Sequence, residues 1–207
     1  MQHVHFESES TPIRLERASV RFPIQLSIPR GFKVSAPASW PTVEGRLEFV
    51  EGALLFMPPC ADYQQDVSAE AVRLLGNWSV LHPEFIVAGN EAGMLLDGEA
   101  RGADVAVWRR ADVGPHRGRF RRVPPILAVE VAGEDEDETS LVAKARWYLK
   151  HGVKTVWLAF PQEREVIVVS SRRTRRLRGA SRLDALGLPD LEVTAVELFR
   201  QLGPAAR

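Results

Sequence analysis

Three segments decide how this chain folds: ADVAVW (residues 103–108), ILAVEVAG (126–133) and ETSLVAKARWYLKHG (138–152). The first two are short apolar runs typical of strands, and the third has the apolar periodicity of a helix. Each segment carries one ionisable residue of interest, namely Asp104, Glu130 and Lys144. Two carboxylates on neighbouring strands and a lysine on the next helix are the groups that a metal-dependent phosphodiesterase requires.

Glu130 is the least expected of the three, because it interrupts the apolar run between Val129 and Val131. An acid in such a strand is expensive to bury unless it is paired, hydrogen-bonded or metal-bound. Strand alternation places its side chain on the same face as Ala128 and Ala132, which leave room for a partner. The alternative is an edge strand with Glu130 facing water, and the pattern alone does not choose between them.

Asp104 and Lys144 also have ordinary alternatives. Asp104 follows the polar segment 99–102 at the start of its strand, where a turn aspartate is common. Successive helical residues turn by about 100°, which places Lys144 at the edge of the apolar arc, beside Tyr148. A lysine there usually lays its stem on the core and extends its head to water. It would add little core area, so we expect Lys144 to act in chemistry and not in folding.

The composition excludes several classes of protein. The chain has 207 residues, 45% of them hydrophobic, which suits one domain with a sizeable core. Its 27 basic and 27 acidic residues cancel, so any site for a polyanion must be local. A single cysteine, Cys60, leaves no internal disulfide and no zinc-finger spacing. The N-terminus lacks a signal-peptide pattern, and no apolar run approaches the roughly 20 residues of a membrane helix. We expect a cytoplasmic protein without a membrane segment.

The order of the predicted elements indicates the fold class. Residues 18–29 alternate like a strand, and Pro23 and Pro29 place that strand at a sheet edge. Glu51-Gly52 joins two short strands as a hairpin. The remaining expected elements are a helix at 62–78, strands at 85–89, 93–97, 103–108 and 126–133, a helix at 138–151, and strands at 155–160 and 165–171. This order predicts an α/β fold with a mixed β-sheet flanked by helices.

Several segments together resemble the Uma-type endonuclease family, which has the restriction-endonuclease-like fold of the PD-(D/E)xK superfamily. They are LEFVEGALLFMPP (47–59), ADVAV, LAVEVAG, the lysine helix ending KHGV, and TVWLAFP (155–161). The resemblance extends over roughly residues 44–199. We therefore expect an N-terminal extension with an edge strand at 1–43, a restriction-endonuclease-like domain at 44–201, and a C-terminal tail at 202–207.

The resemblance implies roles for particular residues. Asp104 and Glu130 would be ligands of Mg²⁺ (or Mn²⁺), and Lys144 would be the catalytic lysine, placed on the helix instead of at Ala132. Glu48 matches the hairpin glutamate of the family, and Glu91 is a second candidate accessory residue. The implied activity is that of a Mg²⁺-dependent DNA endonuclease, acting as a homodimer because a duplex has two strands. The alternatives are a catalytically inactive binding or assembly protein, and a hydrolase for a small phosphodiester.

Two kinds of charged segment bear on DNA binding, and the acidic one is a departure from the family. Five acids, Glu134 to Glu138, stand where the family often has Ser-Pro-Ser, and they should repel a phosphate backbone. Part of the run fits a helix start, with Asp135 and Glu138 as a capping box. A basic connector supplies the candidate DNA contacts Arg117, Arg119, Arg121 and Arg122. A second arginine cluster, at 172–178, is open to the same role or to that of a solvated loop.

Overall fold

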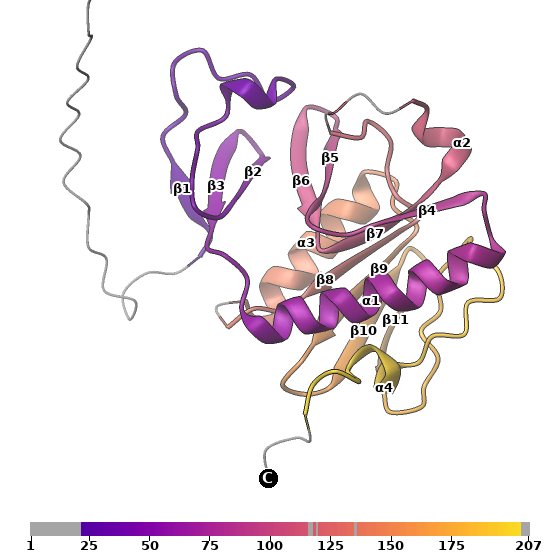
Figure 1. Ribbon diagram of the computed structural model, residues 1–207. Helices are drawn as coiled ribbons and strands as arrows, with labels where there is room; N and C mark the ends of the chain where they lie inside the picture. The colour runs from indigo at the N-terminus through magenta and orange to yellow at the C-terminus, as the bar shows by residue number, and fades with distance from the viewer. Residues whose placement is uncertain (1–21, 116–117, 119, 135, 204–207) are drawn as a thin grey trace, which may run out of the picture.

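The computed structural model describes residues 22–115, 118, 120–134 and 136–203, and their β-strands form two sheets (Figure 1). The smaller sheet has the order β1-β3-β2-β6-β5 and is antiparallel throughout. Its strands are β1 (Ile24–Leu26), β2 (Arg46–Val50), β3 (Ala53–Met57), β5 (Ala92–Leu96) and β6 (Glu99–Ala103). A short 3-10 helix, η2 (Pro37–Ser39), lies in the connection between β1 and β2.

Two local predictions hold in this sheet. β2 and β3 form the expected hairpin, and its turn residues Glu51 and Gly52 have positive φ angles of 50° and 77°. Such angles suit the tight turns that match the twist of paired strands. β1 lies at the sheet edge and pairs only with β3, as its flanking prolines predicted.

The larger sheet has the order β11-β10-β9-β8-β7-β4. Its strands are β4 (Phe85–Ala88), β7 (Val105–Arg109), β8 (Leu127–Val131), β9 (Thr155–Phe160), β10 (Glu165–Ser170) and β11 (Thr174–Arg178). Only β8 and β9 pair in parallel, and helix α3 (Glu138–Lys150) makes the crossover between them. Both strands are buried along their whole length, as a parallel pair covered on both faces requires. This arrangement confirms the α/β class with a mixed sheet.

The two faces of the larger sheet are covered by different elements. Helix α1 (Asp62–Leu81) crosses one face and packs Val67, Ala71 and Leu75 against β7 and β8 (Figure 1). Helix α3 packs Leu141 and Ala145 against the opposite face, in a cluster that also includes side chains of the smaller sheet. Two short helices complete the fold. α2 (Arg110–Val113) directly follows β7, and α4 (Ala195–Leu198) lies in the C-terminal segment. Within the described ranges, no helix has the length and apolar character needed to cross a bilayer.

Two strands were not predicted, and both are poor in apolar residues. The segment 99–102, for which the sequence predicts no strand, forms β6 together with residue 103 and pairs with β5, and the strand predicted from residue 103 begins instead at Val105. The arginine-rich segment 174–178, expected as a solvated loop or a phosphate contact, is β11 and pairs with β10. Its arginines bind acids of this chain: Arg175 binds Asp184, and Arg176 and Arg178 bind Glu165. Strand pairing overrode weak local propensity in both segments.

Candidate active site

Asp104 occupies the position where the chain passes from one sheet to the other. It lies between β6, which ends at Ala103, and β7, which begins at Val105. The Val131 backbone N–H, on β8, donates a 2.7 Å hydrogen bond to Asp104 Oδ2. Since β7 and β8 are paired neighbours, this bond holds Asp104 beside Glu130, as the sequence pattern predicted. Asp104 is therefore held in place by the sheet and is not an isolated turn aspartate.

Glu130 lies in the interior of the larger sheet and has the partners that its burial requires. β8 lies between β7 and β9, so the edge-strand alternative is wrong, and Glu130 is only 2% exposed. The Tyr148 hydroxyl donates to Glu130 Oε1 at 2.6 Å, and the Lys144 ammonium donates to Oε2 at 3.2 Å. Burial and the neighbouring Glu130 charge raise the pKa of Tyr148 well above its ordinary value, so this hydroxyl remains a donor.

Lys144 does not extend its head to water. Its side chain is 12% exposed, and its ammonium contacts Glu130 and, at 2.7 Å, Glu136 Oε1. Burial lowers the pKa of Lys144, but the charges of Glu130 and Glu136 outweigh burial and raise it above its usual value. The sequence predicted a role in chemistry and not in folding; because the ammonium pairs with Glu130 and Glu136, we predict a role in stability as well. A protonated ammonium can neutralise developing charge or orient water.

The donor set around Asp104 fits a hard divalent cation. Burial, and then the charge of Glu130, raise the pKa of Asp104 from 3.8 to about 7. The Glu130 charge thus opposes the ionisation of Asp104, and a bound cation would relieve that repulsion. The described residues contain no cluster of three His, Cys, Asp or Glu side chains arranged around a metal position. Mg²⁺ often takes one or two carboxylates, completing its shell with water and phosphate oxygens, so Asp104 and Glu130 suit Mg²⁺ or Mn²⁺ better than zinc.

Arg46 is a site residue that the sequence reading missed. Its Nη1 donates to Asp104 Oδ1 at 3.2 Å, and its Nε lies 3.7 Å from Glu91 Oε1. Arg46 precedes Glu48 by two residues on β2, so strand alternation places both side chains on one face. This two-residue spacing from Glu48 is the sequence signal that could have identified Arg46 as a site residue.

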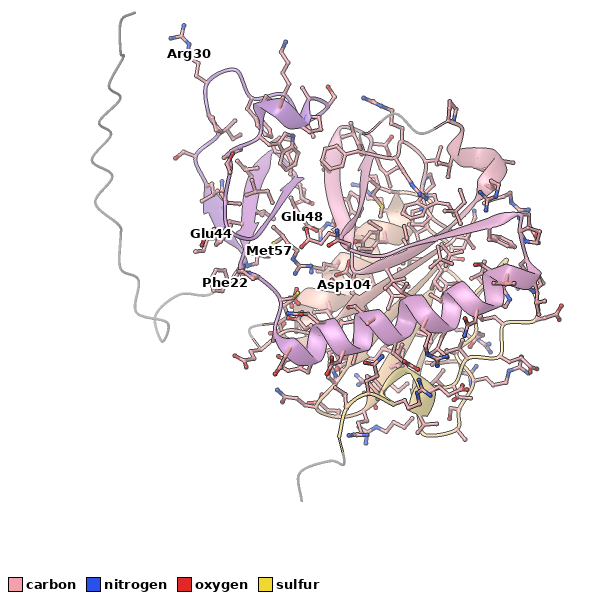
Figure 2. The ribbon with its side chains drawn as sticks, in the orientation of Figure 1. Phe22, Arg30, Glu44, Glu48, Met57 and Asp104 are labelled. Carbon is pink, nitrogen blue, oxygen red and sulfur yellow. The ribbon has the colours of Figure 1, made fainter. Side chains whose placement is uncertain are left out.

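The two accessory candidates, Glu48 and Glu91, line a small pocket together with Arg46. Glu48 is 4% exposed, lies 3.4 Å from Arg101 Nη1, and accepts from the Gly102 backbone N–H. Glu91 lies in the turn between β4 and β5 and is about half exposed. Burial raises the pKa of both carboxyls above its ordinary value. Figure 2 shows Glu48 and Asp104 near each other, between the smaller sheet and the start of α1.

Of the four candidate DNA contacts, the structure describes Arg121 and Arg122, and neither contacts the acids of this site. Arg117 and Arg119 lie outside the described residues. The Arg121 guanidinium lies 4.1 Å from the centre of the Trp108 ring, and burial lowers its pKa. Arg122 is exposed. Neither Arg121 nor Arg122 has a side-chain bond to the acids of the site among the described contacts.

The acidic run separates into parts with different roles. Asp137, and not the predicted Asp135, is the N-cap of α3, and its side chain accepts from the Ser140 N–H at 2.8 Å; Asp135 itself lies outside the described residues. Glu138 pairs with Arg176, and Glu134 is exposed. Glu136 instead turns into the site, where it binds Lys144 and accepts from the Gly133 N–H at 3.1 Å. Although burial raises the pKa of Glu136, the Lys144 ammonium lowers it below its ordinary value, so Glu136 stays ionised.

The raised pKa of Asp104 predicts a pH-dependent stability. The folded carboxyl titrates near pH 7, whereas an unfolded aspartate titrates near about pH 4. The folded state therefore binds the extra proton, and this stabilisation, complete below about pH 4, is lost as the pH rises to about 7. In the presence of a chelator, the free energy of unfolding measured with urea should fall between pH 4.5 and pH 8. The non-titrating Asp104→Asn variant should lack this fall. Parallel profiles for the two proteins would contradict this.

The fold and site define an α/β protein with buried acids and a buried lysine at the junction of two sheets. The sequence matches the family Uma2, described as "Putative restriction endonuclease", over residues 38–197, so the chain belongs to this family. A crystal structure of "a putative nuclease belonging to DUF820" from Anabaena variabilis has the same fold, with a TM-score of 0.70 and 17% identity over 82% of this chain and 98% of that one. Among curated proteins, none matches the sequence. The restriction-endonuclease-like fold and the family expected from the sequence are thus confirmed.

Proposed function

We propose that this protein is a Mg²⁺-dependent DNA endonuclease of the PD-(D/E)xK type. The observation that carries the proposal is the meeting of Asp104, Glu130 and Lys144 at one buried position, in a chain of the Uma2 family. Asp104 and Glu130 would hold Mg²⁺ or Mn²⁺. The cation, when bound, would lower the pKa of an attacking water and polarise the phosphate.

The protein groups have separable roles in this proposal. Tyr148 and the Lys144 ammonium fix the two oxygens of Glu130, so the carboxylate does not rotate. The Val131 N–H fixes Asp104 in the same way. Lys144 stays protonated and so neutralises charge that develops on the phosphate, or orients water, without removing a proton.

A plasmid-nicking assay tests the activity directly. Supercoiled DNA should be converted to the open circle with Mg²⁺ or Mn²⁺ and remain intact with EDTA. The Lys144→Ala protein, checked for folding, separates this activity from that of a contaminating nuclease. Absence of metal-dependent nicking at any protein concentration would leave the second candidate function, a binding or assembly protein that retains the fold. The Glu136–Lys144 contact favours that candidate, because the Glu136 carboxylate is already paired with the ammonium that a substrate phosphate would need.

The acidic run can be tested residue by residue. Glu136→Gln should tighten binding of a DNA duplex at low salt by about fivefold, since it releases Lys144 from a contact of roughly 1 kcal/mol. Glu134→Gln removes the same charge from an exposed position of the same loop and is the matched control. Filter binding measures both. If both variants bind DNA more tightly by the same factor, the cause is the long-range negative field of the acidic run and not the contact with Lys144. Unchanged affinity in both would show that DNA does not approach this loop.

A homodimer and a cytoplasmic location remain predictions. Sedimentation equilibrium with and without a short duplex would measure the assembly state. Two molecules per duplex would support the pairing of active sites that double-strand cleavage needs.

A further inference from the structure

A cavity of 380 Å³ lies next to the proposed site, and Arg46 forms part of its wall. Gln64, at the start of α1, and the loop residues Gly133 and Glu136 form other parts. Phe22 and Met57 also line it, and Figure 2 shows both at the end of the smaller sheet nearest to Asp104. The cavity therefore reaches the site where Arg46 and Glu136 lie.

The Arg46 guanidinium has far more donors than partners. A guanidinium has five N–H donors in a planar fork. Among the described contacts, its single hydrogen bond goes from Nη1 to Asp104 Oδ1. Nε is buried without a hydrogen-bond partner, although it lies 3.7 Å from Glu91, and the whole side chain is 11% exposed. Buried polar atoms without partners are rare, so one beside a cavity needs an explanation.

The charge of Arg46 indicates which kind of ligand the cavity could bind. Although burial lowers its pKa, the facing acids Asp104, Glu130, Glu136 and Glu91 raise it above the ordinary value, so the guanidinium is always cationic. A ligand that uses its remaining donors must be an anion with several acceptor oxygens. A phosphate group matches the planar fork and can accept two parallel hydrogen bonds from it. Lysine could supply the charge at this position but not the fork.

We propose that Arg46 is a catalytic residue that binds a phosphate of the substrate backbone beside Asp104. The proposal rests on the proposed nuclease function for the identity of the substrate. The phosphate would enter from the 380 Å³ cavity, whose wall also carries the carboxylates of Glu134 and Glu136. Arg46 thereby joins Lys144 as a second fixed cation of the site.

The test measures binding and needs no turnover. A fluorescein-labelled 12-nucleotide DNA strand is titrated in EDTA with wild-type protein and with Arg46→Lys, which retains the charge and loses the fork. Fluorescence anisotropy should show about tenfold weaker binding, the loss of one charge-assisted hydrogen bond. Arg182→Lys is the control, because Arg182 is exposed and pairs with Glu192 at 3.5 Å away from the site. The thermal midpoint of each variant and its Mn²⁺ affinity by calorimetry are recorded alongside.

A neutral methylphosphonate at successive linkages of the strand identifies the contact. One such linkage should weaken binding to wild type clearly more than binding to Arg46→Lys, which keeps the charge but lacks the paired donors. Equal affinity of wild type and Arg46→Lys, a loss matched by Arg182→Lys, or no binding by wild type would overturn the proposal. So would a loss that follows the thermal midpoint, since that indicates a role in folding alone. Arg46-dependent binding without metal-dependent nicking would reject the nuclease function and leave the phosphate site in place.

Discussion

Asp104→Ala is expected to abolish Mn²⁺ binding in calorimetry and to lower the rate of plasmid nicking by at least about 100-fold. Changes to groups that merely support a metal ligand cost about 10- to 100-fold, so loss of a ligand should cost more. The physical reason is that Glu130 alone, already bound by Tyr148 and Lys144, cannot supply a second fixed carboxylate. Asp112→Ala, which removes an exposed acid from α2, is the control. Equal Mn²⁺ binding by Asp104→Ala and wild type would remove this metal site.

A companion variant separates this result from unfolding. Asp104→Asn keeps an oxygen that can accept from the Val131 N–H, and it removes the charge that opposes Glu130. It should stay folded, by circular dichroism, while losing metal affinity as Asp104→Ala does. A folded Asp104→Asn protein that binds Mn²⁺ normally would contradict the assignment of Asp104 as a ligand.

Lys144→Ala is expected to lower the free energy of unfolding by about 3 kcal/mol as well as to abolish nicking. Removing one partner of a buried ion pair typically costs about 3–5 kcal/mol, because the remaining charge is left uncompensated. Here both Glu130 and Glu136 lose their cation, and the Lys144 side chain is only 12% exposed. Lys150→Ala, on the exposed face of the same helix, should cost no more than about 1 kcal/mol. Urea unfolding in chelator at pH 7 measures both.

The double variant Lys144→Ala/Glu136→Gln tests that cause. Removing the Glu136 charge should recover part of the lost stability, whereas nicking should stay absent because the ammonium is still missing. If Lys144→Ala is as stable as Lys150→Ala, the lysine is a chemical group without a structural role. If the double variant gains nothing, the loss comes from packing of the lysine stem and not from repulsion between acids.

The sequence alone determined the parts of this protein that depend on neighbouring residues along the chain. Apolar periodicity gave the helices α1 and α3 and the buried strands β7 to β10, and the Glu51-Gly52 turn gave the hairpin. An acid inside an apolar strand identified Glu130, because burying a charge is costly wherever the strand packs. Family resemblance then added the roles expected of Asp104, Glu130 and Lys144.

The tertiary structure decided what depends on partners distant in sequence. Arg46 meets Asp104 across 58 positions, and β6 and β11 became strands because a neighbour supplied hydrogen bonds that their own composition did not favour. The sequence did not distinguish Glu136 from the other four acids of the run, and only the folded loop brings it into contact with Lys144. Periodicity reports which face of an element is apolar. The strength of a charge–charge contact depends on distance and burial, which are fixed only when the sheets and helices pack together.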